Sequence, residues 1–126
     1  MSAGAAAGIP ADGARARNME MASEAAEACL GPGPAAGGDS AFAKAMELAE
    51  AVAGLGDLDD IMFARPSGDC IDMYCSFGKG RVAKASSWLP ADGGEGIMLT
   101  LFLDGSPVYM DEMRIGEMKE MFEKYL

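Results

Sequence analysis

The sequence contains no histidine, and this absence removes a whole group of chemistries. Histidine is the commonest general base and the commonest protein ligand of metal ions. Without it, Ser-His-Asp and Cys-His catalysis would need an imidazole from another molecule. We therefore predict that the protein is not an enzyme, with no catalytic residues, no bound metal and no other cofactor.

Cysteine is scarce as well, with three residues at Cys29, Cys70 and Cys75. Cys70 and Cys75 fall on one predicted strand at an odd spacing, so they point to opposite faces and cannot bridge each other. Three cysteines without histidine complete a structural zinc site only if carboxylates join them. An odd count without a framework spacing is typical of reduced thiols, and we predict a cytoplasmic protein.

Positive charge is in short supply, because 10 Lys and Arg stand against 20 Asp and Glu, which gives a formal net charge of −10. Such a surface repels phosphate, so we expect neither direct nucleic-acid binding nor attachment to an anionic membrane. The N-terminus lacks the basic and apolar regions of a secretory signal, and no apolar run is long enough to span a membrane. The expected partner is a basic protein surface.

What the sequence does have is a largely apolar segment at residues 97 to 103, bounded by Gly96 and by Asp104-Gly105. One face of this predicted strand carries Ile97, Leu99, Leu101 and Leu103, and the other carries Met98, Thr100 and Phe102. A strand that is apolar on both faces belongs inside a sheet rather than at its edge. Neighbouring strands and covering helices are therefore expected.

The rest of the chain supplies these elements in order. Further strands are predicted at 61–64, 70–77, 81–88 and 108–110, and amphipathic helices at 40–53 and 112–125. In the strand 70–77, Ile71, Met73, Cys75 and Phe77 alternate with polar residues, and Gly78 to Arg81 is expected to form a hairpin turn rather than a phosphate loop. The prediction is an α+β fold: an antiparallel meander of four to five strands, with an N-terminal and a C-terminal helix packed on one face.

Residues 1–38 differ from the single α+β domain predicted at 39–126, because Ala and Gly dominate them. Such a segment buries too little apolar surface to offset the cost of ordering, so we predict a flexible low-complexity tail. Within it, residues 18–30 form a candidate helix with Asn18 as its N-cap. Either this helix forms only part of the time, or it docks on the domain or on a partner.

Two features are candidates for partner binding. The first is a set of acidic residues that could stand in for nucleic-acid phosphates, or could simply be solvated: Asp57, Asp59, Asp60, Asp111, Glu112, Glu117, Glu120 and Glu123. The second is Trp88, placed at a strand end, which could anchor an interface or cap the core.

Three hypotheses on function follow. The first is a non-enzymatic acidic protein-binding domain. Its narrower form is an inhibitor or decoy that blocks a basic nucleic-acid-binding partner, by analogy of charge and size alone with phage-encoded inhibitors of restriction or CRISPR machinery. The alternative is an acidic chaperone or adaptor that forms a homodimer through a sheet face carrying Met98, Thr100 and Phe102. The third is a small enzyme that uses carboxylates or one of the cysteines Cys70 and Cys75.

Overall fold

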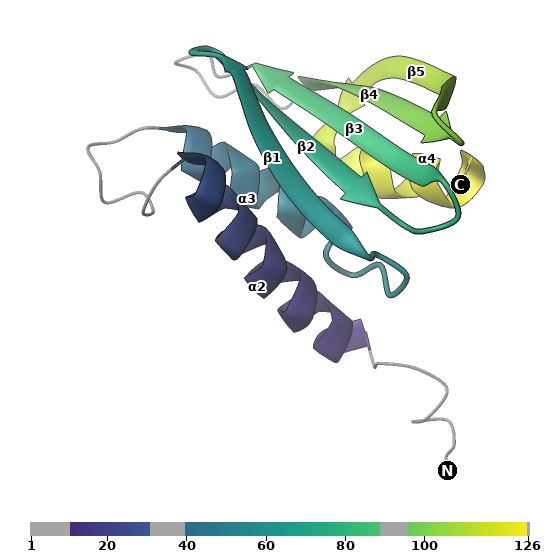
Figure 1. Ribbon diagram of the computed structural model, residues 1–126, viewed down its shortest axis with the longest axis horizontal. Helices are drawn as coiled ribbons and strands as arrows, with labels where there is room; N and C mark the ends of the chain where they lie inside the picture. Colours follow the sequence, from purple (N-terminus) through teal and green to yellow (C-terminus); the bar gives the residue numbers. More distant parts are fainter. Residues whose placement is uncertain (1–10, 31–39, 89–95, 126) are drawn as a thin grey trace.

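The computed structural model describes residues 11–30, 40–88 and 96–125 (Figure 1). The elements are α2 (Ala11–Leu30), α3 (Ser40–Val52), β1 (Asp60–Ser67), β2 (Cys70–Ser76), β3 (Arg81–Trp88), β4 (Gly96–Leu103), β5 (Ser106–Arg114), a 3₁₀ turn (Ile115–Glu117) and α4 (Met118–Tyr125). The rest of the predicted tail and most of the loop before β4 lie outside the described residues. Among the helices described, none is long and apolar enough to cross a membrane.

The predicted α+β fold is confirmed. The five strands form one sheet in the order β1-β2-β3-β4-β5, and each neighbouring pair is antiparallel, so the sheet is a meander. Helices α2, α3 and α4 lie on the same side of this sheet (Figure 1). The turn between β4 and β5 has positive φ at Asp104 (52°) and Gly105 (85°), the backbone that a tight two-residue hairpin requires.

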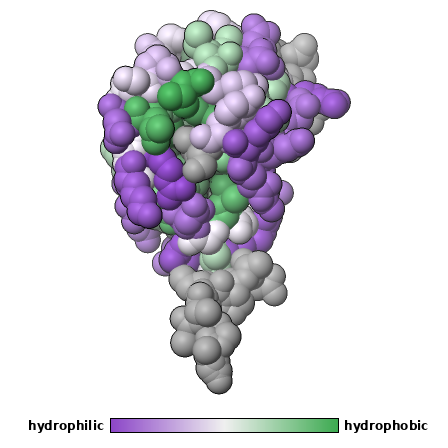
Figure 2. Space-filling model, turned by 90° about the vertical axis from the view of Figure 1, so that its right-hand side faces the viewer, coloured by the Kyte–Doolittle hydropathy of each residue, from purple (hydrophilic) through white to green (hydrophobic). Residues whose placement is uncertain are grey.

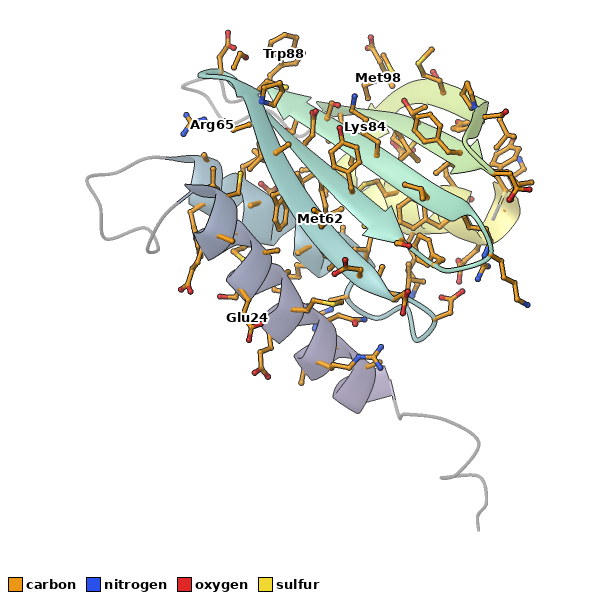
Figure 3. The ribbon with its side chains drawn as sticks, in the orientation of Figure 1. Glu24, Met62, Arg65, Lys84, Trp88 and Met98 are labelled. Carbon is orange, nitrogen blue, oxygen red and sulfur yellow. The ribbon has the colours of Figure 1, made fainter. Side chains whose placement is uncertain are left out.

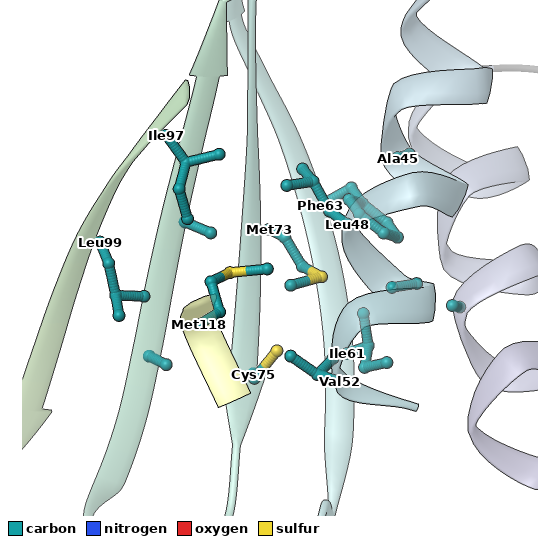
Figure 4. Packing of buried hydrophobic residues seen from close by; sticks show 14 of the residues in the cluster. Ala45, Leu48, Val52, Ile61, Phe63, Met73, Cys75, Ile97, Leu99 and Met118 are labelled. Carbon is teal, nitrogen blue, oxygen red and sulfur yellow. The ribbon is translucent and has the colours of Figure 1, made fainter. Parts of the chain in front are cut away.

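The core lies between the sheet and the helices (Figure 4). Strand β4 contributes Ile97, Leu99 and Leu101, which face the helices as predicted. The helix-facing residues of β2 are also those predicted from alternation, Ile71, Met73 and Cys75. On β3 the same positions hold Ala83, Ala85 and Ser87, and these small side chains explain why its hydrophobic alternation is weak.

Strand β1 is longer than predicted. The sequence predicts residues 61–64, stopped by Pro66, whereas the strand runs from Asp60 to Ser67. Pro66 is tolerated because β1 is an edge strand and its pairing with β2 is irregular between Ala64 and Ser67. Here the tertiary position of the strand decides the outcome, not local propensity.

The start of the C-terminal helix was predicted wrongly. Residues 112–114 belong to β5, and the α-helix begins at Met118 after a 3₁₀ turn. The reason is that β4 offers backbone hydrogen-bonding groups along its whole length, and β5 pairs with all of it, from Ser106 opposite Leu103 to Arg114 opposite Gly96. The backbone N–H of Arg114 then donates to the Glu117 carboxylate at 2.9 Å, at the start of the 3₁₀ turn.

Asn18 is not an N-cap, which corrects a second prediction. Helix α2 begins at Ala11, and Asn18 lies inside it with its side chain fully buried. Its amide donates to the backbone carbonyls of Ala53 (2.8 Å) and Leu55 (3.0 Å), which follow α3. Carbonyls beyond a helix end have no partner within the helix, so Asn18 satisfies them and joins α2 to α3. Of the two interpretations of this segment, the structure has the docked helix.

Replacing Asn18 by alanine should destabilise the protein by about 2–4 kcal/mol, since two hydrogen bonds are lost and two carbonyls stay partly desolvated. The measurement is urea denaturation followed by circular dichroism. Glu24→Ala on the exposed side of the same helix is the control, with an expected change within about 0.5 kcal/mol. Equal stability of Asn18→Ala and the parent chain would mean that α2 does not dock as described.

Candidate functional site

The face of the sheet opposite the helices is not covered by any described helix, and we call it the open face. Strand register assigns alternate residues of all five strands to it. They include Asp60, Met62, Ala64, Cys70, Asp72, Tyr74, Ser76, Val82, Lys84, Ser86, Trp88, Met98, Thr100, Phe102, Met110, Glu112 and Arg114. Apolar and aromatic side chains make up more than half of this set, which is unusual for a surface left in water.

Three apolar side chains of the open face project strongly into solvent. The exposed fraction is 60% for Met62, 65% for Trp88 and 67% for Met110. Figure 3 shows Met62 on β1, and shows Trp88 and Met98 projecting away from helices α2 and α3. Because most of its surface is exposed among the described residues, Trp88 does not cap the core, and its role as an interface anchor stays a prediction.

An apolar hollow lies beside these projections, over strands β1 to β3. Its volume is about 400 Å³, and its lining on the open face includes Met62, Ala64, Tyr74 and Val82. The open face thus has both a hollow and projecting side chains. It can receive an apolar side chain from a partner as well as supply one.

Charge at the centre of the open face is balanced. The Lys84 ammonium lies 3.9 Å from the Asp72 carboxylate and 5.8 Å from the centroid of the Tyr74 ring. Asp72 is almost fully buried although it points away from the helices, because it is surrounded by its neighbours on the sheet. The open face is therefore close to neutral at its centre, although the chain as a whole is strongly acidic.

The predicted acidic residues fall into separate groups. Asp57, Asp59 and Asp60 lie at the start of β1, and Glu123 of α4 lines the same hollow of about 260 Å³ as Asp57. Arg81 also lines this hollow and pairs with Asp57 at 3.6 Å, which reduces the local negative charge.

Asp111, Glu112 and Glu117 form a second group, at the far edge of the sheet. Glu112 lies on β5 and Asp60 on β1, so they are separated by four strand spacings, or roughly 19 Å, across the sheet, and are also offset along the strands. Glu120 is exposed on α4. Figure 2 looks onto the end of the molecule that carries the β4–β5 turn, where hydrophilic residues run down both sides and apolar residues show between them. The eight acidic residues thus do not form one continuous face.

Trp88 lines one hollow together with two of the predicted acidic residues. A hollow of about 430 Å³ at the end of β3, β4 and β5 is lined by Trp88, Glu112 and Glu117, together with Met98, Met113 and Arg114. The structure therefore brings three of the nine predicted partner-binding residues around one depression.

The cysteines of β2 are poorly suited to catalysis. Burial raises the pKa of the Cys75 thiol to about 12. Burial, and then the Asp72 carboxylate whose oxygen lies 3.7 Å from the sulfur, also raises the pKa of Cys70. A nucleophilic cysteine needs a lowered pKa, so neither thiol is activated. Within the described ranges, no three Cys, Asp or Glu side chains come together as a metal site.

Sequence reasoning anticipated part of the open face and missed the rest. Met98, Thr100 and Phe102 were identified from the alternation of one strand, whereas the hollow beside Tyr74 and the positions of Met62 and Met110 on the same face were not. The available signal was the alternation in residues 60–64, but locating Met62 on the face also required the pairing of β1 with β2.

Comparison with protein-family models, with curated proteins and with solved structures found no match to this chain.

The three thiols should differ in their reactivity with an alkylating reagent under native, mildly alkaline conditions. Cys29 is exposed and should react first, Cys70 should react more slowly, and Cys75 should react only on unfolding. A pKa of about 12 makes the thiolate fraction of Cys75 roughly a thousandfold smaller than that of a free thiol. Mass spectrometry of the alkylated peptides follows each site. Faster labelling of Cys70 than of Cys29 would reveal an activated thiol and favour the enzyme hypothesis.

Proposed function

We propose that this protein is a non-enzymatic protein-binding domain that recognises its partner through the open face of the sheet. The observation that carries the proposal is the exposure of Met62, Trp88 and Met110 on one face of a sheet whose other face is covered by helices. Exposed apolar groups around a hollow are typical of protein interfaces, where a few aromatic and methionine side chains supply most of the binding energy.

The chemistry of the chain supports binding rather than catalysis. Histidine is absent, and the pKa values of both cysteines on β2 are raised rather than lowered. The carboxylates predicted for partner binding lie in separate groups rather than as a converging pair. Shape and charge are thus the means that this chain has for recognising another molecule.

A single substitution on the open face should abolish partner capture. Met62→Glu places a charge on an exposed apolar position, so folding should be preserved while binding falls at least tenfold. Ala16→Glu adds the same charge at an exposed position of α2, where the residue lines no hollow shared with Met62, and serves as the matched control. Tagged versions of the full chain would be used to capture proteins from cells of the native host.

The informative result is the difference between the two variants. Proteins captured by the parent chain and by Ala16→Glu, and lost with Met62→Glu, are expected. An identical set of captured proteins with all three chains would overturn the open face as the recognition surface.

A second, narrower proposal is a decoy for a basic nucleic-acid-binding protein. The net charge of −10 and the two acidic groups at opposite edges of the sheet favour a basic partner surface. Such a contact would be weakened by salt, because exposed charges are screened beyond about 10 Å at 0.1 M ionic strength. The division of the acidic residues means that one group, rather than a continuous strip, would face the partner.

Competition distinguishes the decoy from other protein-binding roles. A captured partner that binds nucleic acid should lose that binding when the protein is present in excess. Replacing Asp57, Asp59 and Asp60 by asparagine should weaken the competition about tenfold, while replacing Glu20, Glu24 and Glu27 of α2 by glutamine should not. Fluorescence anisotropy of labelled nucleic acid provides the measurement. Undiminished nucleic-acid binding at saturation would reject the decoy and leave the protein-binding proposal standing.

A further inference from the structure

A second copy of this chain is a candidate occupant of the open face, and the charges of the two copies decide where they can approach each other. Two copies that each carry a net charge of −10 repel each other over most of their surfaces. On the open face of the three central strands, however, the charged residues are Asp72 and Lys84, and they lie 3.9 Å apart. Repulsion between copies is therefore smallest where these strands face each other.

The apolar residues of β3 are arranged so that two copies can complement each other. Val82 borders the apolar hollow, and Trp88 projects from the other end of the strand. Each lies three residues, or roughly 10 Å, from Ala85. Consider a two-fold axis that lies in the plane between the two sheets, crosses β3 over Ala85 and runs perpendicular to that strand. It would place Trp88 of each copy against Val82 of the other. An interface with two-fold symmetry requires this kind of self-complementarity.

The same axis also separates like charges. It sets Lys84 opposite Ser86, and the strand register then sets Asp72 opposite Tyr74 and Glu112 opposite Met110. No charged side chain of this set meets its own copy. An axis along β3 would instead bring the two Lys84 side chains together, so the perpendicular arrangement is favoured.

The size of the open face suits a dimer that dissociates on dilution. Five strands about 4.8 Å apart, each about eight residues long, span roughly 24 by 26 Å, or about 600 Å² per copy. A stable protein interface commonly buries about 800 Å² per partner, so this area lies at the low end.

From these observations we infer that the open face is occupied by a second copy of the chain, packed face to face about a two-fold axis over Ala85. The inference rests on the proposed role of the open face in protein binding and identifies its partner. Helices α2, α3 and α4 then lie on the outside of the dimer, and their acidic residues stay available to a basic protein.

The test uses the full chain and its single tryptophan, Trp88. Sedimentation equilibrium should give a mass that rises with concentration from 13.0 kDa to twice that value. The fluorescence emission of Trp88 should shift to shorter wavelength with the same midpoint, because the indole leaves water as the dimer forms. Agreement of the two midpoints assigns association to the open face.

Variants test the arrangement and keep Trp88 as the reporter. Val82→Glu and Met62→Glu should each raise the dissociation constant at least tenfold, whereas Ala16→Glu should leave it unchanged. Circular dichroism verifies folding. The inference is overturned by a mass of 13.0 kDa at every concentration, by dimers without a Trp88 shift, or by variants that associate like the control. A monomer that still captures other proteins through the open face overturns this inference alone.

Discussion

The structure depends on one constraint: β4 is apolar on both of its faces, and the described helices cover only one of them. Ile97, Leu99 and Leu101 pack against the helices, and each fully buried side chain of this kind contributes about 1.5–3 kcal/mol. Met98, Thr100 and Phe102 lie on the other face and remain partly exposed. The stability of the fold thus comes mainly from the helical side, and the open side is the surface that we propose for recognition.

The helical layer is held together by side chains of two kinds. Alanines such as Ala22, Ala26 and Ala45 allow α2 and α3 to approach closely, and they contribute little apolar area themselves. Asn18 supplies the specificity that alanines lack, because its amide satisfies carbonyls beyond α3 from inside α2. This polar contact helps to hold α2 against β1, and Glu24 of α2 points away from the sheet (Figure 3).

Local sequence pattern was sufficient for elements whose hydrophobic pattern is regular from end to end. Strand β2 alternates cleanly, and β4 is apolar throughout, so both were predicted. Residues 112–114 carry no strong preference, and their place in β5 is decided by β4, which lies more than ten residues away. Helix α2 was underestimated for the same reason, since the contacts of Asn18 span 35 and 37 residues. The full extent of the open face could not be identified from sequence, because identifying it requires the register between strands, and no single strand carries that information.

Methionine oxidation tests most directly whether the open face is a binding surface, because Met62 and Met110 report on it from opposite edges. Peroxide treatment followed by peptide mass spectrometry would be applied to the protein diluted, concentrated and in host extract. Met62 and Met110 should oxidise readily when the protein is dilute, and should be protected when it is concentrated or in extract. Met73 and Met118 are buried and should stay protected throughout. Equally fast oxidation of Met62 and Met110 under all three conditions would contradict the account.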